Sequence, residues 1–179
     1  MKEIRLHGRG GQGVVKSSQI VVKAAVDAGS FGQFIPFFGV ERKGSPVYGY
    51  LRLDSQAIRR KMQVYEPEIL LIFDDTLISM EETYAGVREN SLVVINTKLP
   101  IDKLMLPSAV SEVAALDATG IALETIGRSI PNTAMLGAFA KAAGLVDKDI
   151  LFKEISSTFG EKNMEAAKTA YEKVSITKL

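Results

Sequence analysis

The chain has 179 residues, of which 46% are hydrophobic and 24% are charged, as in an ordinary globular protein with a buried core. Its 22 basic and 21 acidic residues leave a net charge of +1, which excludes a whole-molecule field that attracts nucleic acid. The absence of cysteine excludes disulfides, thiolate nucleophiles and cysteine-ligated clusters, and the presence of a single histidine excludes multi-histidine zinc sites. Because no secretory signal or membrane-spanning apolar run is recognisable, we expect a soluble cytoplasmic protein that contacts no membrane.

The first elements are expected to be a strand, a glycine-rich turn and a helix. Residues 2–7 alternate, with Ile4 and Leu6 on one side, which predicts a strand with one buried face. A helix is expected from about residue 13 to residue 28, because Gly29 is a common C-terminal cap.

The middle of the chain is expected to alternate between strands and a helix. Continuous apolar runs are typical of parallel strands buried on both faces, whereas alternation indicates a partly one-sided edge strand. The helix would be capped by Asp75 or Thr76. In chain order we expect a strand at 31–35, a loop at 36–46, the one-sided strand at 47–53, buried strands at 69–73 and 92–95 with a helix at 76–88 between them, and a strand at 113–116.

The last third of the chain is expected to be helical. A helix should begin near Thr119, another should end near Gly144, Asp147 should cap the next, and the last should follow Gly160. Strands that alternate with helices predict a three-layer α/β/α fold with a mainly parallel, partly mixed sheet. We expect one domain, residues 1–179, with a Rossmann-like glycine turn after its first strand.

The glycine-rich turn is the first candidate binding site. Gly8, Gly10 and Gly13 have the G-x-G-x-x-G spacing of a dinucleotide-binding loop, and the helix that follows would present free N–H groups to an anion. NAD binding also needs an acidic residue about 20 positions later, and residues 30–39 contain none. Three interpretations stay open: a purely structural turn, a site for phosphate or another polar ligand, and an NAD site.

A cluster of aromatic and charged residues between 31 and 50 is the second candidate. Its prolines and glycines indicate a surface loop, in which the charged residues are Glu41, Arg42 and Lys43. Aromatic rings beside arginine suit a protein interface, or a purine and phosphate site. The alternative is that the rings belong to the core and the charges to a solvated rim.

Other candidates have plain structural alternatives. Asp74 and Asp75 end a predicted strand and could bind Mg²⁺, although one such residue more often caps the next helix. The basic residues 59–61 are typical of a solvated surface. His7 is expected to be structural or a neighbour of the glycine turn, and no catalytic triad can be assembled.

Three segments together carry a resemblance to a known family. GRGGQGVV (8–15), FGVERKGSPVYGYLRL (38–53) and IPNTAMLGAFAKAAGLV (130–146) are similar, in order, to segments of the gamma subunits of 2-oxoacid:ferredoxin oxidoreductases, in particular the pyruvate type. The similarity covers nearly the whole chain. Lys43 stands where the family usually has arginine, so a bidentate contact to carboxylate or phosphate is lost there.

The resemblance implies an assembly in which this chain has no complete active site, no catalytic residue and no metal ligand. Such complexes oxidatively decarboxylate pyruvate on thiamine diphosphate with Mg²⁺, pass electrons through [4Fe–4S] clusters to ferredoxin, and form acetyl-CoA. The cofactors would lie on alpha, beta and delta subunits. We expect this chain to help bind coenzyme A, through Gly8, Arg9, Gly10, Gly11, Gln12, Gly13, Glu41, Arg42 and Lys43. The alternatives are a free-standing NAD(P)-binding oxidoreductase and a non-catalytic interaction module.

Overall fold

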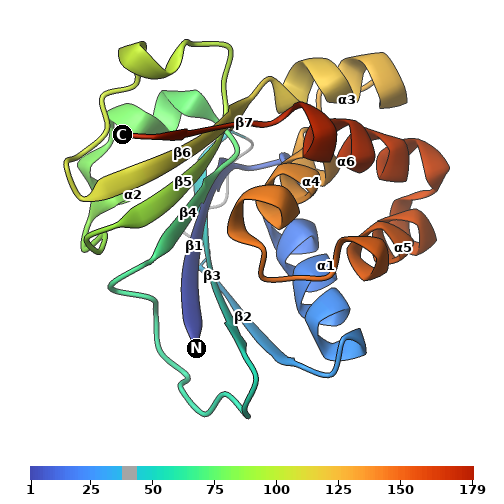
Figure 1. Ribbon diagram of the computed structural model, residues 1–179, viewed down its shortest axis with the longest axis horizontal. Helices are drawn as coiled ribbons and strands as arrows, with labels where there is room; N and C mark the ends of the chain where they lie inside the picture. Colours follow the sequence, from blue (N-terminus) through green and yellow to red (C-terminus); the bar gives the residue numbers. More distant parts are fainter. Residues whose placement is uncertain (38–43) are drawn as a thin grey trace.

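The structure, a computed structural model, describes residues 1–37 and 44–179 and builds them around a seven-stranded mixed sheet (Figure 1). The strand order is β2-β3-β1-β4-β5-β6-β7. The four central strands β1, β4, β5 and β6 pair in parallel, while antiparallel pairs form both edges. The strands are β1 (Lys2–Arg9), β2 (Phe31–Phe37), β3 (Pro46–Asp54), β4 (Ile69–Ile72), β5 (Ser91–Asn96), β6 (Val110–Leu116) and β7 (Ser175–Lys178).

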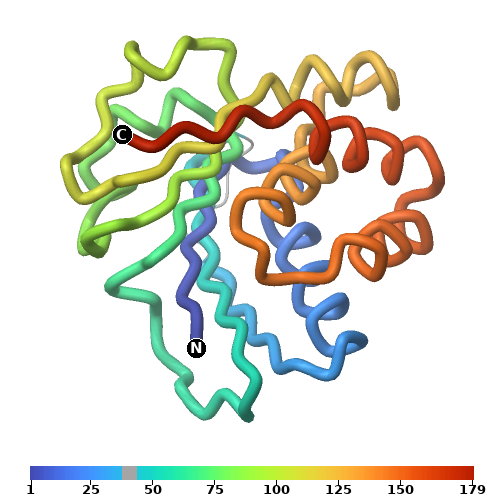
Figure 2. The backbone as a smooth tube through the Cα atoms, viewed as in Figure 1, coloured from blue at the N-terminus to red at the C-terminus, as the bar shows by residue number. Residues whose placement is uncertain are grey.

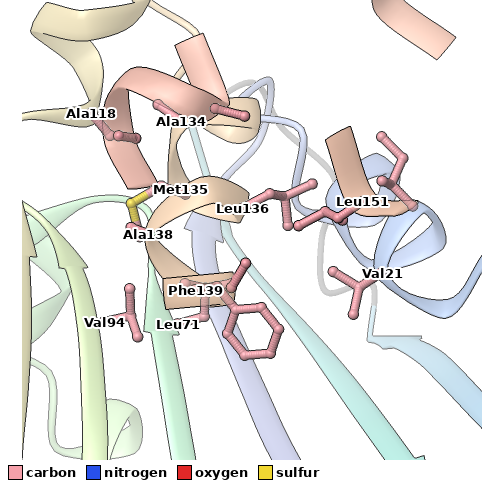
Figure 3. Close-up of a cluster of buried hydrophobic side chains, with 14 of the residues drawn as sticks. Val21, Leu71, Val94, Ala118, Ala134, Met135, Leu136, Ala138, Phe139 and Leu151 are labelled. Carbon is pink, nitrogen blue, oxygen red and sulfur yellow. The ribbon is translucent and has the colours of Figure 1, made fainter. Parts of the chain in front are cut away.

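Five helices cover one face of this sheet, on the right of Figure 1. They are α1 (Val14–Asp27), α3 (Ala118–Ile126), α4 (Asn132–Ala143), α5 (Lys148–Phe159) and α6 (Glu161–Lys173). Helix α4 lies against the central strands β4, β5 and β6. Figure 3 shows its Met135 and Phe139 between Leu71 of β4, Val94 of β5 and Val21 of α1, all buried.

Short helical segments cover the opposite face. They are η1 (Asp75–Ser79), α2 (Glu81–Tyr84) and η2 (Ile101–Lys103). Because side chains alternate along a strand, Leu70 and Ile72 of β4 point to this second core, where they pack with Leu77. The α/β fold with a helical C-terminal part is therefore confirmed, with one thick and one thin helical layer.

The prediction of a helix at 76–88 is wrong. Asp74, and neither Asp75 nor Thr76, caps the segment, because its side chain accepts the N–H of Thr76 and starts a 3₁₀ turn. A four-residue helix follows, and the chain then turns at Gly86, whose φ is +69° and whose Cα lies against the carbonyl of Tyr65. A longer helix would not allow this turn.

Three other expectations need correction. The strand at 47–53 is not an edge: β3 lies between β2 and β1. The last third is not wholly helical, because β7 returns beside β6, as the dark red end of the tube in Figure 2 shows. The first strand is buried on both faces, since Glu3, Arg5 and His7 are covered as well as the apolar side chains between them.

The expected C-terminal helix boundaries are confirmed. Asp147 caps α5 by accepting the N–H groups of Asp149 and Ile150. Gly144 ends α4, and α6 begins after Gly160. Within the described residues, no helix combines the length and the apolar character needed to cross a membrane.

Candidate functional site at the carboxyl edge of the sheet

The glycine turn joins the end of β1 to the start of α1. Gly13 takes a φ of +82°, which favours glycine, and a Cβ there would also lie 2.8 Å from Nδ2 of Asn132. Gly8 is equally constrained, because a Cβ would lie 2.5 Å from a methyl of Val14. The N–H of Gly10 donates to the carbonyl of Ser45 at 2.9 Å, which ties the turn to the segment before β3.

The turn lies where the sheet changes the side to which its connections go. After β1 the chain crosses to the face that carries α1, whereas after β4 it crosses to the face that carries η1 and α2. Such a switch leaves a crevice beyond the carboxyl ends of the two neighbouring strands, where open α/β sheets bind ligands. We therefore take the region between the residues that follow β1 and those that follow β4 as the candidate site, and refer to it below as the crevice.

Gln12 and Arg9 bridge this crevice to Asp74. Nε2 of Gln12 donates to Oδ2 of Asp74 at 2.8 Å, and Oε1 of Gln12 accepts the N–H of Arg9 at 2.7 Å. The Arg9 guanidinium lies 3.5 Å from the same carboxylate oxygen and donates to Oγ1 of Thr76 and to the carbonyl of Gly44. Arg9 is thus held at the mouth of the crevice by groups that a ligand could replace.

Asp74 is ionised under ordinary conditions. Its partial burial acts to raise its pKa, but hydrogen bonds from Thr76 and Gln12, together with the charge of Arg9, outweigh burial and lower the pKa below its usual value. The crevice therefore has an anionic wall on its β4 side and cationic and N–H groups on its glycine-turn side.

Polar side chains at the next strand ends fix the neighbouring elements. Asn96, the last residue of β5, donates to the carbonyl of Phe73 and to Oγ1 of Thr119, and so links the end of β4 to the start of α3. Thr97 donates to Asp75 at 2.7 Å. Because these groups are paired with each other, they have a structural role at this edge. Within the described residues, no three His, Asp or Glu side chains gather as a metal site would require.

The aromatic residues lie on strands, so the expected surface loop is wrong for most of them. On the face opposite α1, one cross-strand row contains Phe37, Tyr48 and His7, in register across β2, β3 and β1. The His7 ring meets Tyr48 edge-on at 5.0 Å, and Phe37 lies 6.4 Å from Tyr48 with 42% of its surface exposed. This row ends beside the glycine turn.

His7 has a structural role, because its ring stays neutral in the physiological pH range. Burial, and then the charge of Arg5, lower its pKa to about 3. Nε2 of His7 accepts from Nε of Arg5 at 2.9 Å, so the proton of the neutral ring is on Nδ1, for which the described residues offer no acceptor. A group that stays neutral across the physiological range does not serve as an acid near neutrality.

The structure brings six of the nine predicted binding residues together. Gly8, Arg9, Gly10, Gly11, Gln12 and Gly13 form the turn described above. The other three predicted residues, Glu41, Arg42 and Lys43, lie outside the described residues, and so does Phe38. The basic segment 59–61 lies in the connection between β3 and β4, and its Arg60 comes within 3.8 Å of Glu3.

Sequence reasoning missed two partners of the glycine turn. Asp74 is recognisable as a residue at a strand end, but the sequence does not show that Gln12 and Arg9 reach it from 62 and 65 positions away. Asn132 begins α4 and packs against Gly13, a contact that depends on how α4 docks on α1. The Asn132 segment carries the family resemblance, which was the available signal.

Comparison with known proteins gives consistent results over the whole chain. Residues 3–173 match the model of the family described as pyruvate ferredoxin/flavodoxin oxidoreductase. The chain is 46% identical to pyruvate synthase subunit PorC of Methanothermobacter marburgensis, covering 97% of this chain and 98% of that one. It is 44% identical to the common gamma subunit of the pyruvate/ketoisovalerate oxidoreductases of Pyrococcus abyssi, with 98% of each covered. The crystal structure of pyruvate oxidoreductase subunit PORC from Thermotoga maritima superposes with a TM-score of 0.87 at 32% identity, covering 98% of each chain.

Proposed function

This chain belongs to the pyruvate ferredoxin/flavodoxin oxidoreductase family, and from that premise we propose that it is the gamma subunit of a multi-subunit pyruvate:ferredoxin oxidoreductase. The observation that carries the proposal is identity of more than 40% along the full length of gamma-type subunits from different archaea. Relatives that cover 98% of this chain are themselves named as subunits, so the same role suits this chain.

The residues of this chain agree with a subunit whose redox cofactors lie elsewhere. It has no cysteine to ligate an iron–sulfur cluster, and within its described residues no three His, Asp or Glu side chains cluster as they would around a metal ion. We therefore assign those cofactors, and the contact with ferredoxin, to the alpha, beta and delta subunits. Because the Pyrococcus abyssi relative is common to two oxidoreductases, we also place the choice of 2-oxoacid on other chains.

Assembly is tested by purification from native extract. The full chain, tagged and expressed in its own organism, should copurify with three other polypeptides, at least one of them rich in cysteine, and mass measurement would identify them. The purified assembly should reduce ferredoxin in a reaction that requires pyruvate and coenzyme A. A chain that purifies alone and enhances NAD(P)H fluorescence would instead support the free-standing oxidoreductase.

Within the assembly, we propose that the glycine turn helps to bind coenzyme A. The N–H groups at the start of α1 and the guanidinium of Arg9 suit a phosphate, and coenzyme A carries both a pyrophosphate and a 3′-phosphate. Arg42 and Lys43 would meet a second phosphate, and an exposed ring such as Phe37 would stack on the adenine.

Saturation binding of coenzyme A to the purified complex tests this role. Arg9→Ala and Arg42→Ala should each weaken binding about tenfold, because each removes a charge-assisted contact. Arg59→Ala is the matched control, since it removes the same charge from an exposed segment at the opposite end of the sheet. Unchanged affinity in both test variants would show that these arginines are structural.

A further inference from the structure

One half of the sheet carries no helix on the side that faces away from α1. The short helical segments on that side pack on β4, β5 and β6, in the cluster that contains Leu70 and Val93. On the other side, Phe34 of β2 packs on the main core and Gly32 lies against Val22 of α1. Because side chains alternate along a strand, the odd-numbered residues of β2 point away from α1. Within the described residues, α1 is the only helix that packs on β2 or β3.

Aromatic side chains line this uncovered side. Strands β2, β3 and β1 bring them into two neighbouring cross-strand rows, which we call the aromatic face: Ile35, Tyr50 and Arg5 in one row, and Phe37, Tyr48 and His7 in the other. The partly exposed ring of Phe37 lies 6.4 Å from those of both Tyr48 and Tyr50. Phenylalanine, tyrosine and arginine are the residue types enriched in the cores of protein interfaces.

Exposed apolar side chains continue beyond these two rows. Phe31, at the start of β2 and on the same side, is 44% exposed. Met62 is 54% exposed, and its carbonyl accepts from Arg52, which lies on this side of β3. Large apolar side chains that gather on one uncovered side of a sheet indicate a surface that another protein covers.

Arg5 is a buried cation without an anionic partner on this face. It is 7% exposed, and the described residues offer it no ion pair. Nε donates to the ring of His7 at 2.9 Å and Nη2 to the carbonyl of Thr83 at 3.0 Å, whereas Nη1 has no hydrogen-bond partner among the described residues. Arg52, which is buried to a similar degree, is by contrast paired with Glu3 at 2.8 Å.

The unpaired charge of Arg5 calls for an anion. Burial lowers the pKa of Arg5, and the nearby Tyr50 and Tyr48 partly offset this effect. A guanidinium nevertheless stays protonated in proteins, so the charge remains and its burial costs free energy. A carboxylate placed against Nη1 would compensate this charge and add a charge-assisted hydrogen bond.

We propose that the aromatic face is the surface through which this chain docks on another subunit, and that this subunit places an aspartate or glutamate against Arg5. The partner is a different chain and not a second copy, because two copies packed face to face would bring two unpaired guanidinium groups into one interface. The identity of the partner as an oxidoreductase subunit rests on the function proposed above, whereas the anionic character of its docking segment rests on Arg5.

Affinity for the other subunits tests the docking surface. The remaining oxidoreductase subunits, purified without this chain, are titrated with the full-length chain, and analytical ultracentrifugation gives the dissociation constant. Phe37→Ser and Arg5→Gln should each weaken the association at least about tenfold, because the first removes an exposed ring and the second removes the charge. Circular dichroism shows whether each variant is folded, and Phe37→Ser keeps the test independent of any loss of stability in Arg5→Gln.

Two exposed residues on the helical side provide matched controls. Leu123→Ser, on α3, removes an apolar side chain that is 50% exposed, and Arg128→Gln, just after α3, removes an exposed charge. Each should change the dissociation constant by less than about twofold. Parental affinity in both Phe37→Ser and Arg5→Gln would overturn the proposal.

Zero-length crosslinking tests the carboxylate directly. In the Arg5→Lys complex, a carbodiimide should condense the new amine with an adjacent carboxylate of another subunit, with loss of water, and mass spectrometry of the linked peptides identifies both residues. The parent complex is the control, because its guanidinium does not form this amide. A link to an aspartate or glutamate of another subunit would support the proposal. The absence of a link, or a link to a second copy or to a carboxylate of the same chain, would overturn it.

These outcomes differ from those of a failure of the proposed function. If the parent chain does not associate with other oxidoreductase subunits at all, the proposed function is contradicted, and with it the identity of the partner. If the parent associates and Phe37→Ser and Arg5→Gln bind as tightly, the proposed function stands and the aromatic face is not the docking surface.

Discussion

An arginine lies near a carboxylate at each end of β1, but the two arginines are held very differently. At the amino end, Arg52 of β3 is 1% exposed, donates to Glu3 at 2.8 Å, and also donates to the carbonyls of Met62 and Gln63. At the carboxyl end, Arg9 keeps 32% of its side chain exposed, and its oxygen partners lie at the rim of the crevice.

The difference indicates a structural role for the arginine at the amino end of β1 and a binding role for the arginine at its carboxyl end. The buried guanidinium uses its donors inside the protein, and it ties the connection between β3 and β4 to the sheet. The half-exposed one can exchange its partners for a ligand without uncovering the core. Stability should therefore depend on the amino end of β1, and binding on the carboxyl end.

The largest expected effect is loss of the buried arginine. Arg52→Ala should lower the free energy of unfolding by about 3–5 kcal/mol, because the buried carboxylate of Glu3 loses its 2.8 Å partner and keeps only the exposed Arg60 and Arg88 at 3.8 Å. Urea unfolding followed by circular dichroism measures it, and Arg59→Ala, which is exposed, should change stability by less than about 0.5 kcal/mol. A loss below about 1 kcal/mol in Arg52→Ala would mean that the amino end is not the structural end.

The second effect is a pH dependence due to His7. Its folded pKa of about 3 lies below the unfolded value of 6.5, so between these values the unfolded state binds a proton that the folded state does not. Stability should therefore be constant above pH 6.5 and fall below it, by about 2 kcal/mol between pH 7 and pH 5.

His7→Gln is the control for this pH dependence. The glutamine oxygen can accept from Arg5 as the ring does, but it does not titrate. Because His7 is the sole histidine of the chain, the variant should unfold with nearly the same free energy at pH 7 and pH 5. Equal pH slopes in both proteins would contradict the assignment.

A smaller effect is expected at the β4 side of the crevice. Asp74→Ala removes the cap of η1 and should cost about 1 kcal/mol, as caps of this type usually do. Thermal unfolding would detect it, with the exposed Glu89→Ala as control. The same variant frees Gln12 and Arg9, so a loss as large as that of Arg52→Ala would indicate that the crevice, too, is a structural centre.

The smallest effect on stability is expected for Arg9. Arg9→Ala should change the free energy of unfolding by less than about 1 kcal/mol, because its ion pair is partly exposed and screened by solvent. Its effect on ligand binding should be much larger. Unfolding and coenzyme A binding, measured on one preparation, would show whether Arg9→Ala affects affinity more than stability. A loss of stability without a loss of coenzyme A affinity would contradict the binding role assigned to Arg9.

The sequence predicts the parts of this fold that depend on local patterns. The apolar runs that became β4 and β5, and the caps at Asp147 and Gly144, are recognisable because neighbouring residues determine them. Strand β7 is not, since SITK is a strand only through its pairing with β6. In the candidate site, too, some features follow from neighbouring residues and others only from tertiary contacts.

The glycine spacing of residues 8–13 is visible in the sequence, whereas the partners of the turn come from distant elements. Asp74 reaches Gln12 because β4 lies beside β1, and Asn132 reaches Gly13 because α4 docks on α1. Both contacts follow from tertiary packing, for which a single sequence offers no direct signal.

Reconstitution of the oxidoreductase with and without this chain tests the central claim most directly. The other subunits, purified without it, should show little pyruvate- and coenzyme A-dependent ferredoxin reduction, and added full-length chain should restore it, while the chain alone is inactive. Full activity of the complex without this chain, or nicotinamide-dependent turnover by the chain alone, would contradict the claim that it acts as a subunit.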